Sequence, residues 1–198
     1  MGSTVPFVGL TGGLGSGKST ALAALQRLGA ATISSDAVVH DLYGEAEVRD
    51  AVMGRFGEEV APGGIVDRSA LAERAFATAE DRAWLEQLLW PRVGARVGEW
   101  LEAARASEPA PPAAVVEVPL LFEAGMEAIY DATIAVLADE QVRARRAAAR
   151  GHAVVDERAA RQLTQGEKAA RATYVVRNDG SEEDLERELS AVLAKLAG

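Results

Sequence analysis

The stretch VGLTGGLGSGKST at residues 8–20 decides the fold of this chain. Gly12 and Gly17 stand five positions apart and are followed at once by Lys18 and Ser19. This spacing matches Gly-x-x-x-x-Gly-Lys-Ser/Thr, a loop whose glycines let backbone N–H groups surround phosphate oxygens without Cβ clashes. The lysine neutralises the β- and γ-phosphates of a nucleotide, and the hydroxyl ligates Mg²⁺. A tight turn without a ligand is the alternative, but the complete pattern arises by chance in about 1% of such chains or fewer.

The segments on both sides of the loop support phosphate binding. Residues 5–10 are apolar with β-branched and aromatic members, which predicts a short buried strand. Leucines recur near helical spacing over residues 18–28, and Gly29 follows where a helix end favours a residue tolerant of positive φ. We therefore expect the loop between a strand and the N-terminus of a helix, where the helix dipole adds positive charge.

Strand-like and helix-like segments alternate along the rest of the chain. Further strands are predicted at residues 31–34, 113–118, 132–137 and 174–177. Helices are predicted over most of 37–56, from residue 69 onward, and at 81–90, 91–106, 139–150, 155–171 and 181–196, with turns at 57–67 and an extended linker at 108–112. Pro91 suits the first turn of its helix. The order predicts an α/β fold, a P-loop NTPase three-layer core with a parallel five-stranded sheet.

Composition and charge exclude several classes of protein. Hydrophobic residues make up 48% of the chain, and no apolar run approaches the ~18 residues of a membrane span. The formal charge of −9 and the pI near 4.8 argue against nonspecific binding to nucleic acid or anionic membranes. The absence of cysteine excludes disulfides and thiolate metal sites, so any metal would be held by oxygen atoms. No signal peptide is recognisable, and we expect a cytoplasmic protein.

Two acidic residues lie at or just past the ends of predicted strands, where open α/β sheets carry their ligands. Asp36 follows the strand at 31–34 and could orient an attacking hydroxyl and accept its proton. Capping the following helix is an alternative role, and both roles can coexist. Glu117 lies within the apolar segment 113–118, which indicates a nearby cation such as Mg²⁺. An acid at a frayed strand end is the alternative for Glu117.

Basic residues cluster on the predicted helix at 139–150 of this acidic chain. They are Arg143, Arg145, Arg146 and Arg150, and the last two share a helix face. Arginine forks suit phosphate oxygens, so a lid bearing them could close over ATP and exclude water. A solvated basic face is the alternative for each of the four.

The segment Asn178-Asp179-Gly180 follows the last predicted strand. An asparagine side chain there could recognise a purine edge through its paired donor and acceptor. Simple turn chemistry is the alternative that the sequence favours by itself.

These segments together resemble the dephospho-coenzyme A kinase family. The resemblance is carried by the loop at 8–20, Ser35-Asp36-Ala37, Val66-Asp-Arg-Ser-Ala-Leu71, Leu85-Glu86, Val118-Pro-Leu-Leu-Phe-Glu123, the arginine helix, Gln162 with Lys168, and Arg177-Asn-Asp-Gly180. It covers nearly the whole chain. The Val-Pro-Leu-Leu-Phe-Glu segment and the late Asn-Asp-Gly are far more particular to this family than the phosphate loop, which many families share.

The resemblance implies an enzyme that transfers the terminal phosphate of ATP to the ribose 3′-hydroxyl of dephospho-coenzyme A, the last step of coenzyme A synthesis. Asp36 would be the base, Lys18 and Arg146 would also be catalytic, and Ser19 with Glu117 would hold Mg²⁺. The implied nucleotide contacts are Gly13, Leu14, Gly15, Ser16, Gly17, Lys18, Ser19, Thr20, Arg150 and Asn178, the last near adenine. The implied acceptor contacts are Thr11, Asp36, Arg68 and Leu120.

The resemblance also implies a single domain with three parts. These are a core at 1–60, 113–138 and 172–198, a helical acceptor-binding lobe at about 61–112, and an arginine-bearing lid at about 139–171. The implied partner is the small-molecule acceptor, without nucleic acid or membrane, and the protein is expected to be a monomer or a weak homo-oligomer. The chain departs from the family at Trp90-Pro91 for the usual His-Pro, at Ala172-Thr173 for Ala-Asp, and at Glu117 for Asp.

Two other functions remain open at the level of sequence. The nearer is another small-molecule kinase on the same core, acting on a nucleoside monophosphate or a sugar acid. The second is a nucleotide-dependent regulatory switch, against which stands the absence of an Asn-Lys-x-Asp guanine signature.

Overall fold

The computed structural model describes residues 5–149 and 162–197, apart from the side chains of 147–149. The chain divides into two compact units, Met1–Ser34 with Leu101–Gly198, and Ser35–Trp100. The second unit begins before the helical lobe expected at 61–112, and acceptor binding by that lobe stays a prediction. Within the described ranges, no helix has both the length and the apolar character needed to cross a membrane.

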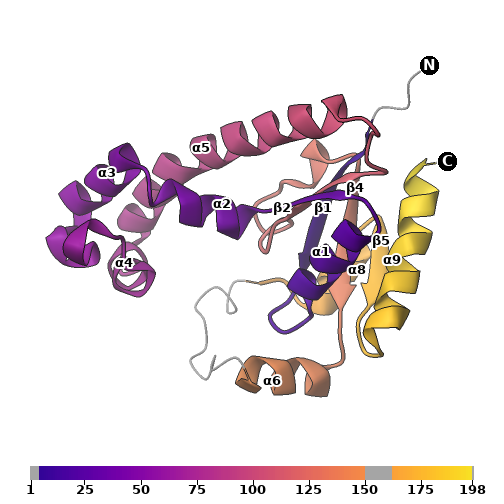
Figure 1. Ribbon diagram of the computed structural model, residues 1–198. Coiled ribbons are helices and arrows are strands. Elements are labelled where there is room, and N and C mark those ends of the chain that lie inside the picture. Colours follow the sequence, from indigo (N-terminus) through magenta and orange to yellow (C-terminus); the bar gives the residue numbers. More distant parts are fainter. Residues whose placement is uncertain (1–4, 150–161, 198) are drawn as a thin grey trace. The chain divides into compact units, whose positions relative to one another are not determined.

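A five-stranded parallel sheet forms the centre of the first unit, as the sequence predicted. Its strands are β1 (Phe7–Gly12), β2 (Ala31–Ser34), β3 (Ala114–Glu117), β4 (Ala132–Leu137) and β5 (Tyr174–Arg177). They lie in the order β2-β3-β1-β4-β5 (Figure 1). Every residue of β3 and β4 is buried, which explains why both segments are mainly apolar without alternation, apart from Glu117 and Thr133.

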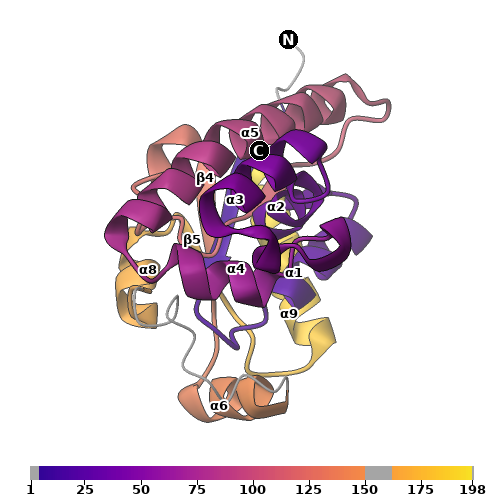
Figure 2. The same cartoon turned by 90° about the vertical axis from the view of Figure 1, so that its left-hand side faces the viewer.

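Helices cover both faces of this sheet. The helices described in the first unit are α1 (Lys18–Arg27), α6 (Glu140–Ala149), α8 (Gln165–Arg171), α9 (Glu182–Ala197) and the 3₁₀ turn η3 (Glu127–Ile129). Val8 and Leu10 of β1 are fully buried in a core with α1 and α9. Because side chains alternate along a strand, Thr11 points to the opposite face, where Lys168 of α8 approaches it at 3.5 Å. Figure 2 shows α8 on the other side of the sheet from α1 and α9.

The second unit is helical. It holds α2 (Ser35–Leu42), α3 (Ala46–Phe56), the 3₁₀ turns η1 (Glu58–Val60) and η2 (Pro62–Gly64), α4 (Arg68–Ala75) and most of α5 (Ala79–Ala106). Val48, Val52 and Phe56 form the buried face of α3. The Phe56 ring packs edge-on against Trp84 at 5.5 Å between centroids. Asp67 caps α4 by accepting hydrogen bonds from two backbone N–H groups.

The structure corrects the prediction that Pro91 opens a separate helix. α5 runs without interruption from Ala79 to Ala106, with Pro91 inside it. Proline lacks the N–H that would bind the carbonyl one turn earlier. Beside this gap, the Arg92 guanidinium donates to the carbonyl oxygen of Leu88 at 2.8 Å. The continuous helix therefore has a side-chain donor next to the position where proline removes a backbone donor.

Element boundaries also differ from the sequence prediction, most clearly at the end of β1 and the start of α8. β1 extends to Gly12 because its main chain stays paired with β4 as far as Val136. The helix predicted at 155–171 begins, among the described residues, only at Gln165, because Thr164 caps it in a complete capping box with Glu167. Residues 155–161 of that prediction lie outside the described part of the chain.

Candidate phosphate-binding and catalytic site

The loop between β1 and α1 has the geometry of an anion site. β1 ends at Gly12 and α1 begins at Lys18, as expected. Gly15 and Gly17 have φ values of 74° and 89°, which L side chains rarely adopt. Gly17 is the N-cap of α1 and, as a glycine, has no side chain to cap the helix, and no acidic residue occupies the first turn. The first N–H groups of a helix have no intrahelical partner, so this end can bind a negative group.

Neighbouring segments pack so closely on the loop that its glycines cannot be replaced without movement. A Cβ atom at Gly12 would stand 2.5 Å from the carbonyl oxygen of Val136 in β4. A Cβ atom at Gly15 would stand 2.6 Å from the carbonyl oxygen of Arg143 in α6. A Cβ atom at Gly17 would stand 2.0 Å from Nδ2 of Asn178. The glycine pattern therefore reflects the close approach of two backbone carbonyls and one side-chain amide, as well as the turn itself.

Lys18 and Ser16 bring polar atoms to the loop. The Nζ atom of Lys18 donates to the carbonyl oxygens of Gly12 at 3.1 Å and Gly13 at 3.3 Å. Ser16 is fully buried, and among the described residues its Oγ has no hydrogen-bond partner. A buried hydroxyl without a partner is costly, and a phosphate oxygen would satisfy it. The donors present therefore suit a phosphate chain.

Two arginines of α6 and one asparagine hold the loop from outside. Arg143 donates through Nε to the carbonyl oxygen of Leu14 at 2.9 Å. Arg146 donates to the carbonyl oxygen of Asn178 at 3.0 Å, and Nδ2 of Asn178 donates to that of Ser16 at 2.9 Å. The arginine helix, the loop and the end of β5 thus form one connected hydrogen-bond network.

The sequence interpretation gave Arg143 no role of its own and assigned Asn178 to adenine. Arg143 stands three residues before Arg146, a spacing that places both on one helix face and could have indicated a joint role. Arg145, between them, is exposed. Asn178 is buried at 4% exposure, and its amide is engaged with the loop. The adenine contact remains a prediction, and Arg150 lies outside the described residues.

Charged side chains join the start of α6 to the end of β5. Arg177 pairs with Asp139 at 2.9 Å and with Asp179 at 2.8 Å. The Asp179 carboxylate, through its hydrogen bond, is the main cause that raises the pKa of Arg177, and Asp139 adds to it. All three groups are partly or largely exposed, so the cluster orients these segments more than it stabilises the fold.

Oxygen donors suitable for Mg²⁺ lie at the same edge of the sheet. Ser19 stands in the first turn of α1, and Glu117 ends β3 in register with Leu10 of β1. Glu117 is buried at 9% exposure. The described residues contain no group of three or more His, Cys, Asp and Glu side chains able to hold a metal. Mg²⁺ in kinases is bound by one or two protein oxygens plus phosphates and water, so these two residues fit it.

The predicted acceptor contacts fall in both units. Thr11 is fully buried, and its hydroxyl donates to the carbonyl oxygen of Pro119 at 3.2 Å, next to Leu120. Asp36 and Arg68 belong to the second unit, where both are exposed. α2 begins at Ser35, so Asp36 stands inside the first turn and is not the N-cap considered as an alternative.

Glu123 and Lys168 form a buried ion pair beside this segment, with Nζ and Oε1 2.8 Å apart. In the sequence they stood out only through the family resemblance. The charge of Glu123 directly after five residues rich in apolar side chains is a local signal of a buried partner.

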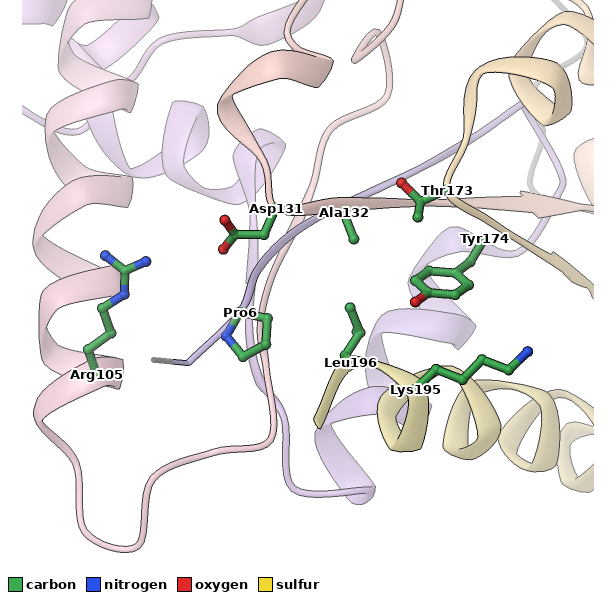
Figure 3. A pocket seen from close by; sticks show the side chains of 8 residues that line it. All are labelled: Pro6, Arg105, Asp131, Ala132, Thr173, Tyr174, Lys195 and Leu196. Atoms are coloured by element: carbon green, nitrogen blue, oxygen red, sulfur yellow. The ribbon is translucent and has the colours of Figure 1, made fainter. Parts of the chain in front are cut away.

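A separate pocket of about 470 Å³ lies elsewhere in the first unit (Figure 3). It is lined by Pro6, Arg105, Asp131, Ala132, Thr173, Tyr174, Lys195 and Leu196. Pro6 precedes β1, while Ala132 and Tyr174 are the first residues of β4 and β5. The pocket is therefore at the amino ends of the strands, and the phosphate loop is at their carboxyl ends.

Comparisons with known proteins agree with this geometry. The family model described as dephospho-CoA kinase matches residues 6–184. A dephospho-CoA kinase of Anaeromyxobacter dehalogenans is 40% identical over 196 residues, covering 96% of this chain and 92% of that protein. The crystal structure of TT1252 from Thermus thermophilus is 38% identical, with a TM-score of 0.82 over 99% of this chain and 100% of that one.

A more distant structure shows the extent of the shared fold. The dephospho-CoA kinase from Campylobacter jejuni is 23% identical, with a TM-score of 0.64 over 98% of both chains. At this identity the likeness supports the fold alone, and it agrees with the predicted P-loop core. The glycine loop, its supporting arginines and the match over residues 6–184 lead to one conclusion, that the chain belongs to the dephospho-CoA kinase family of P-loop kinases.

Proposed function

We propose that the chain transfers the γ-phosphate of ATP to the ribose 3′-hydroxyl of dephospho-coenzyme A through the residues assigned below. The observation that carries this proposal is the loop from Gly12 to Ser19, which combines glycines of positive φ, a helix that begins at a glycine N-cap, and a buried hydroxyl without a partner in the described structure. Phosphoryl transfer depends on positioning and electrostatics, so no protein nucleophile is required.

The phosphates of ATP would bind to the loop. Backbone N–H groups at residues 13–20 would surround the phosphate oxygens, and the Lys18 ammonium would move from the loop carbonyls to the β- and γ-phosphates. Ser19 and Glu117 would hold Mg²⁺, which supplies charge neutralisation at the transferring group. Asn178 already donates to the loop through Nδ2, so its Oδ1 atom is the part suited to accept from the adenine amino group.

The arginines of the lid would stabilise the transferring phosphate. In the structure Arg146 donates to a carbonyl at the end of β5, within the network that surrounds the loop. Exchange of that carbonyl for a phosphate oxygen would give a stronger, charge-assisted hydrogen bond. We assign the same role to Arg150, which the resemblance pairs with Arg146.

The acceptor would be oriented by the residues that the family resemblance assigns to it. The carboxylate of Asp36 would accept the proton of the attacking hydroxyl, a task for which its position two residues after β2 is suited. Thr11, Arg68 and Leu120 would bind the remainder of dephospho-coenzyme A. Arg68 would pair with its phosphates, since both are charged and the arginine is exposed.

The cellular setting follows from the same proposal. In this proposal the protein acts in the cytoplasm, as a monomer or a weak homo-oligomer. The formal charge of −9 argues against nonspecific binding to nucleic acid.

The test is a panel of acceptors incubated with Mg-ATP and purified protein. The panel contains dephospho-coenzyme A, nucleoside monophosphates and sugar acids, and mass spectrometry detects and locates any added phosphate. We expect one phosphate on the ribose 3′ position of dephospho-coenzyme A. Faster transfer to a nucleoside monophosphate or a sugar acid would reject the assignment.

A further inference from the structure

Lys168 is a fully buried cation in α8. Lysine is almost never fully buried unless its ammonium is paired, because removing the charge from water is costly. The side chain lies on the face of the sheet that carries Thr11, away from the core made by α1 and α9. None of the roles proposed above uses it.

The ammonium of Lys168 contacts three residues, one in β1 and two in the segment after β3. Its Nζ is 2.8 Å from Oε1 of Glu123, 3.1 Å from the carbonyl oxygen of Pro119 and 3.5 Å from Oγ1 of Thr11. The Thr11 hydroxyl donates to that same carbonyl oxygen. Lys168 and Thr11 together fix the main chain of Pro119, directly before Leu120.

The hydrogen bonds of Glu123 extend beyond its ion pair with Lys168. Its Oε1 accepts from both Lys168 and the N–H of Leu163, while its buried Oε2 has no partner in the described residues. Replacing both members of a buried ion pair by neutral groups is often tolerated, whereas removing one member is strongly destabilising. Stability alone therefore does not account for a lysine at this position.

The same region also reaches the phosphate loop. Leu163 precedes α8, and Oε1 of its neighbour Gln162 accepts from the N–H of Leu14 at 3.2 Å. The segment that leads into α8 thus binds the phosphate loop at one point and, through Glu123, the segment after β3 at another.

We propose that Lys168 is a positioning residue that holds the Pro119–Leu120 main chain against Thr11 and so shapes the wall that binds the acceptor. This rests on the proposed function, in which Thr11 and Leu120 contact dephospho-coenzyme A. The ammonium itself touches neither the acceptor nor ATP. Its loss affects acceptor binding more than nucleotide binding, because its contacts are to Thr11, Pro119 and Glu123, and no hydrogen bond or ion pair found in the described residues joins it to residues 12–19.

Three variants test the proposal. Lys168→Met removes the ammonium and keeps a flexible apolar side chain. The double variant Lys168→Met with Glu123→Gln also removes the carboxylate charge that the single change leaves unpaired. Lys195→Met, on the exposed side of α9, is the matched control. For each protein we measure the KM for dephospho-coenzyme A, the Kd for ATP, kcat and the melting temperature.

We expect Lys168→Met to raise the KM for dephospho-coenzyme A about tenfold, with the ATP Kd within about twofold of the wild type. The double variant recovers much of the lost melting temperature, yet its acceptor KM stays raised because the contacts to Pro119 and Thr11 are still missing. Lys195→Met leaves all four quantities unchanged. If Lys168→Met does not fold, the ratio of the acceptor KM to the ATP Kd in the double variant is sufficient to test the proposal.

Recovery of the acceptor KM together with the melting temperature in the double variant would overturn the proposal, since Lys168 would then serve only to neutralise Glu123. An unchanged KM in Lys168→Met, or a proportional rise in the ATP Kd, would overturn it as well. The wild-type protein separates this result from the wider assignment. If it fails to phosphorylate dephospho-coenzyme A, the proposed function is wrong, whereas transfer by the wild type with an unchanged variant KM rejects only the positioning role.

Discussion

Single residues fix the phosphate loop at positions where a Cβ atom has no room. Gly17 is the sharpest case, because it combines a φ of 89° with a side-chain amide 2.0 Å from the place of a Cβ atom. That amide belongs to Asn178, which also binds the carbonyl oxygen of Ser16. A change at Gly17 therefore strains the backbone and displaces a support of the loop at once.

Gly17→Ala should lower both stability and nucleotide affinity. We expect a loss of about 1–3 kcal/mol in the free energy of unfolding and at least about a tenfold rise in the ATP Kd. Denaturant titration and calorimetry measure the two quantities. Gly54→Ala is the control, because a Cβ atom at this helical glycine of α3 meets nothing within 4 Å and should stabilise the protein by about 0.5–1 kcal/mol. Equal changes in the free energy of unfolding and in the ATP Kd of the two variants would contradict the proposal that this loop encloses the phosphates.

Asp36→Asn tests the proposed base. The amide keeps the shape of the side chain but cannot accept the proton of the acceptor hydroxyl, so kcat should fall by about 10²–10⁴ with the melting temperature unchanged. Asp41→Asn, also exposed on α2, should keep wild-type turnover. Steady-state kinetics decide, and near-normal turnover of Asp36→Asn would remove the residue from the chemistry.

Tyr130 should make stability depend on pH in the alkaline range. Burial raises the pKa of its hydroxyl from 10.0 to about 12, so the unfolded chain releases this proton before the folded protein does. The folded state is then favoured in full below pH 10, and this contribution is lost as pH rises to about 12. Between pH 9 and 12 the wild type should lose up to about 2 kcal/mol more than Tyr130→Phe. If the free energies of unfolding of the two proteins change equally with pH, the prediction is wrong and burial does not raise the pKa of the Tyr130 hydroxyl.

At the scale of helices and strands, the sequence predicted what depends on local pattern. The five strands, the loop after β1 and the helix that follows it come from apolar runs and spacing. The continuous α5 was missed because proline usually marks a helix start, and the Arg92 side chain that donates beside it is visible only in three dimensions.

The parts of the site that could not be predicted are contacts between distant segments. Arg143 meets Leu14 across 129 positions, and Asn178 meets Ser16 across 162. Periodicity within a helix or a strand carries no information on such pairs. Only the folded structure therefore shows which distant residues contact the loop, whereas the sequence already shows the residue types of the loop itself.

Helix α6 gives a prediction of its own. Arg146→Ala should lower the single-turnover rate about 10²–10³-fold while the ATP Kd changes by no more than a few-fold, because the proposed contact forms with the transferring phosphate. Arg145→Ala removes the same charge from an exposed neighbour and should have little effect. Rapid-quench kinetics measure the rate. Equal losses in the two variants would mean that general charge, not the Arg146 contact, is responsible.

At the scale of the whole molecule, an acidic protein must bind two anionic substrates. The formal charge is −9, so attraction has to come from groups placed at short range. Lys18, Arg143 and Arg146 are gathered around one loop through hydrogen bonds to its carbonyls and to the end of β5. A few cations placed next to the loop, together with the helix dipole and the backbone N–H groups, therefore attract the anionic substrates in place of a broad basic surface.

The central claim is that the loop holds the triphosphate while Asp36 meets the acceptor hydroxyl. A crystal structure with Mg²⁺, a non-hydrolysable ATP analogue and dephospho-coenzyme A tests it most directly. We predict the β- and γ-phosphates within the N–H groups of residues 13–20, and the Asp36 carboxylate about 3 Å from the ribose 3′-hydroxyl. A triphosphate bound away from this loop, or Asp36 beyond hydrogen-bonding reach of that hydroxyl, would contradict the account.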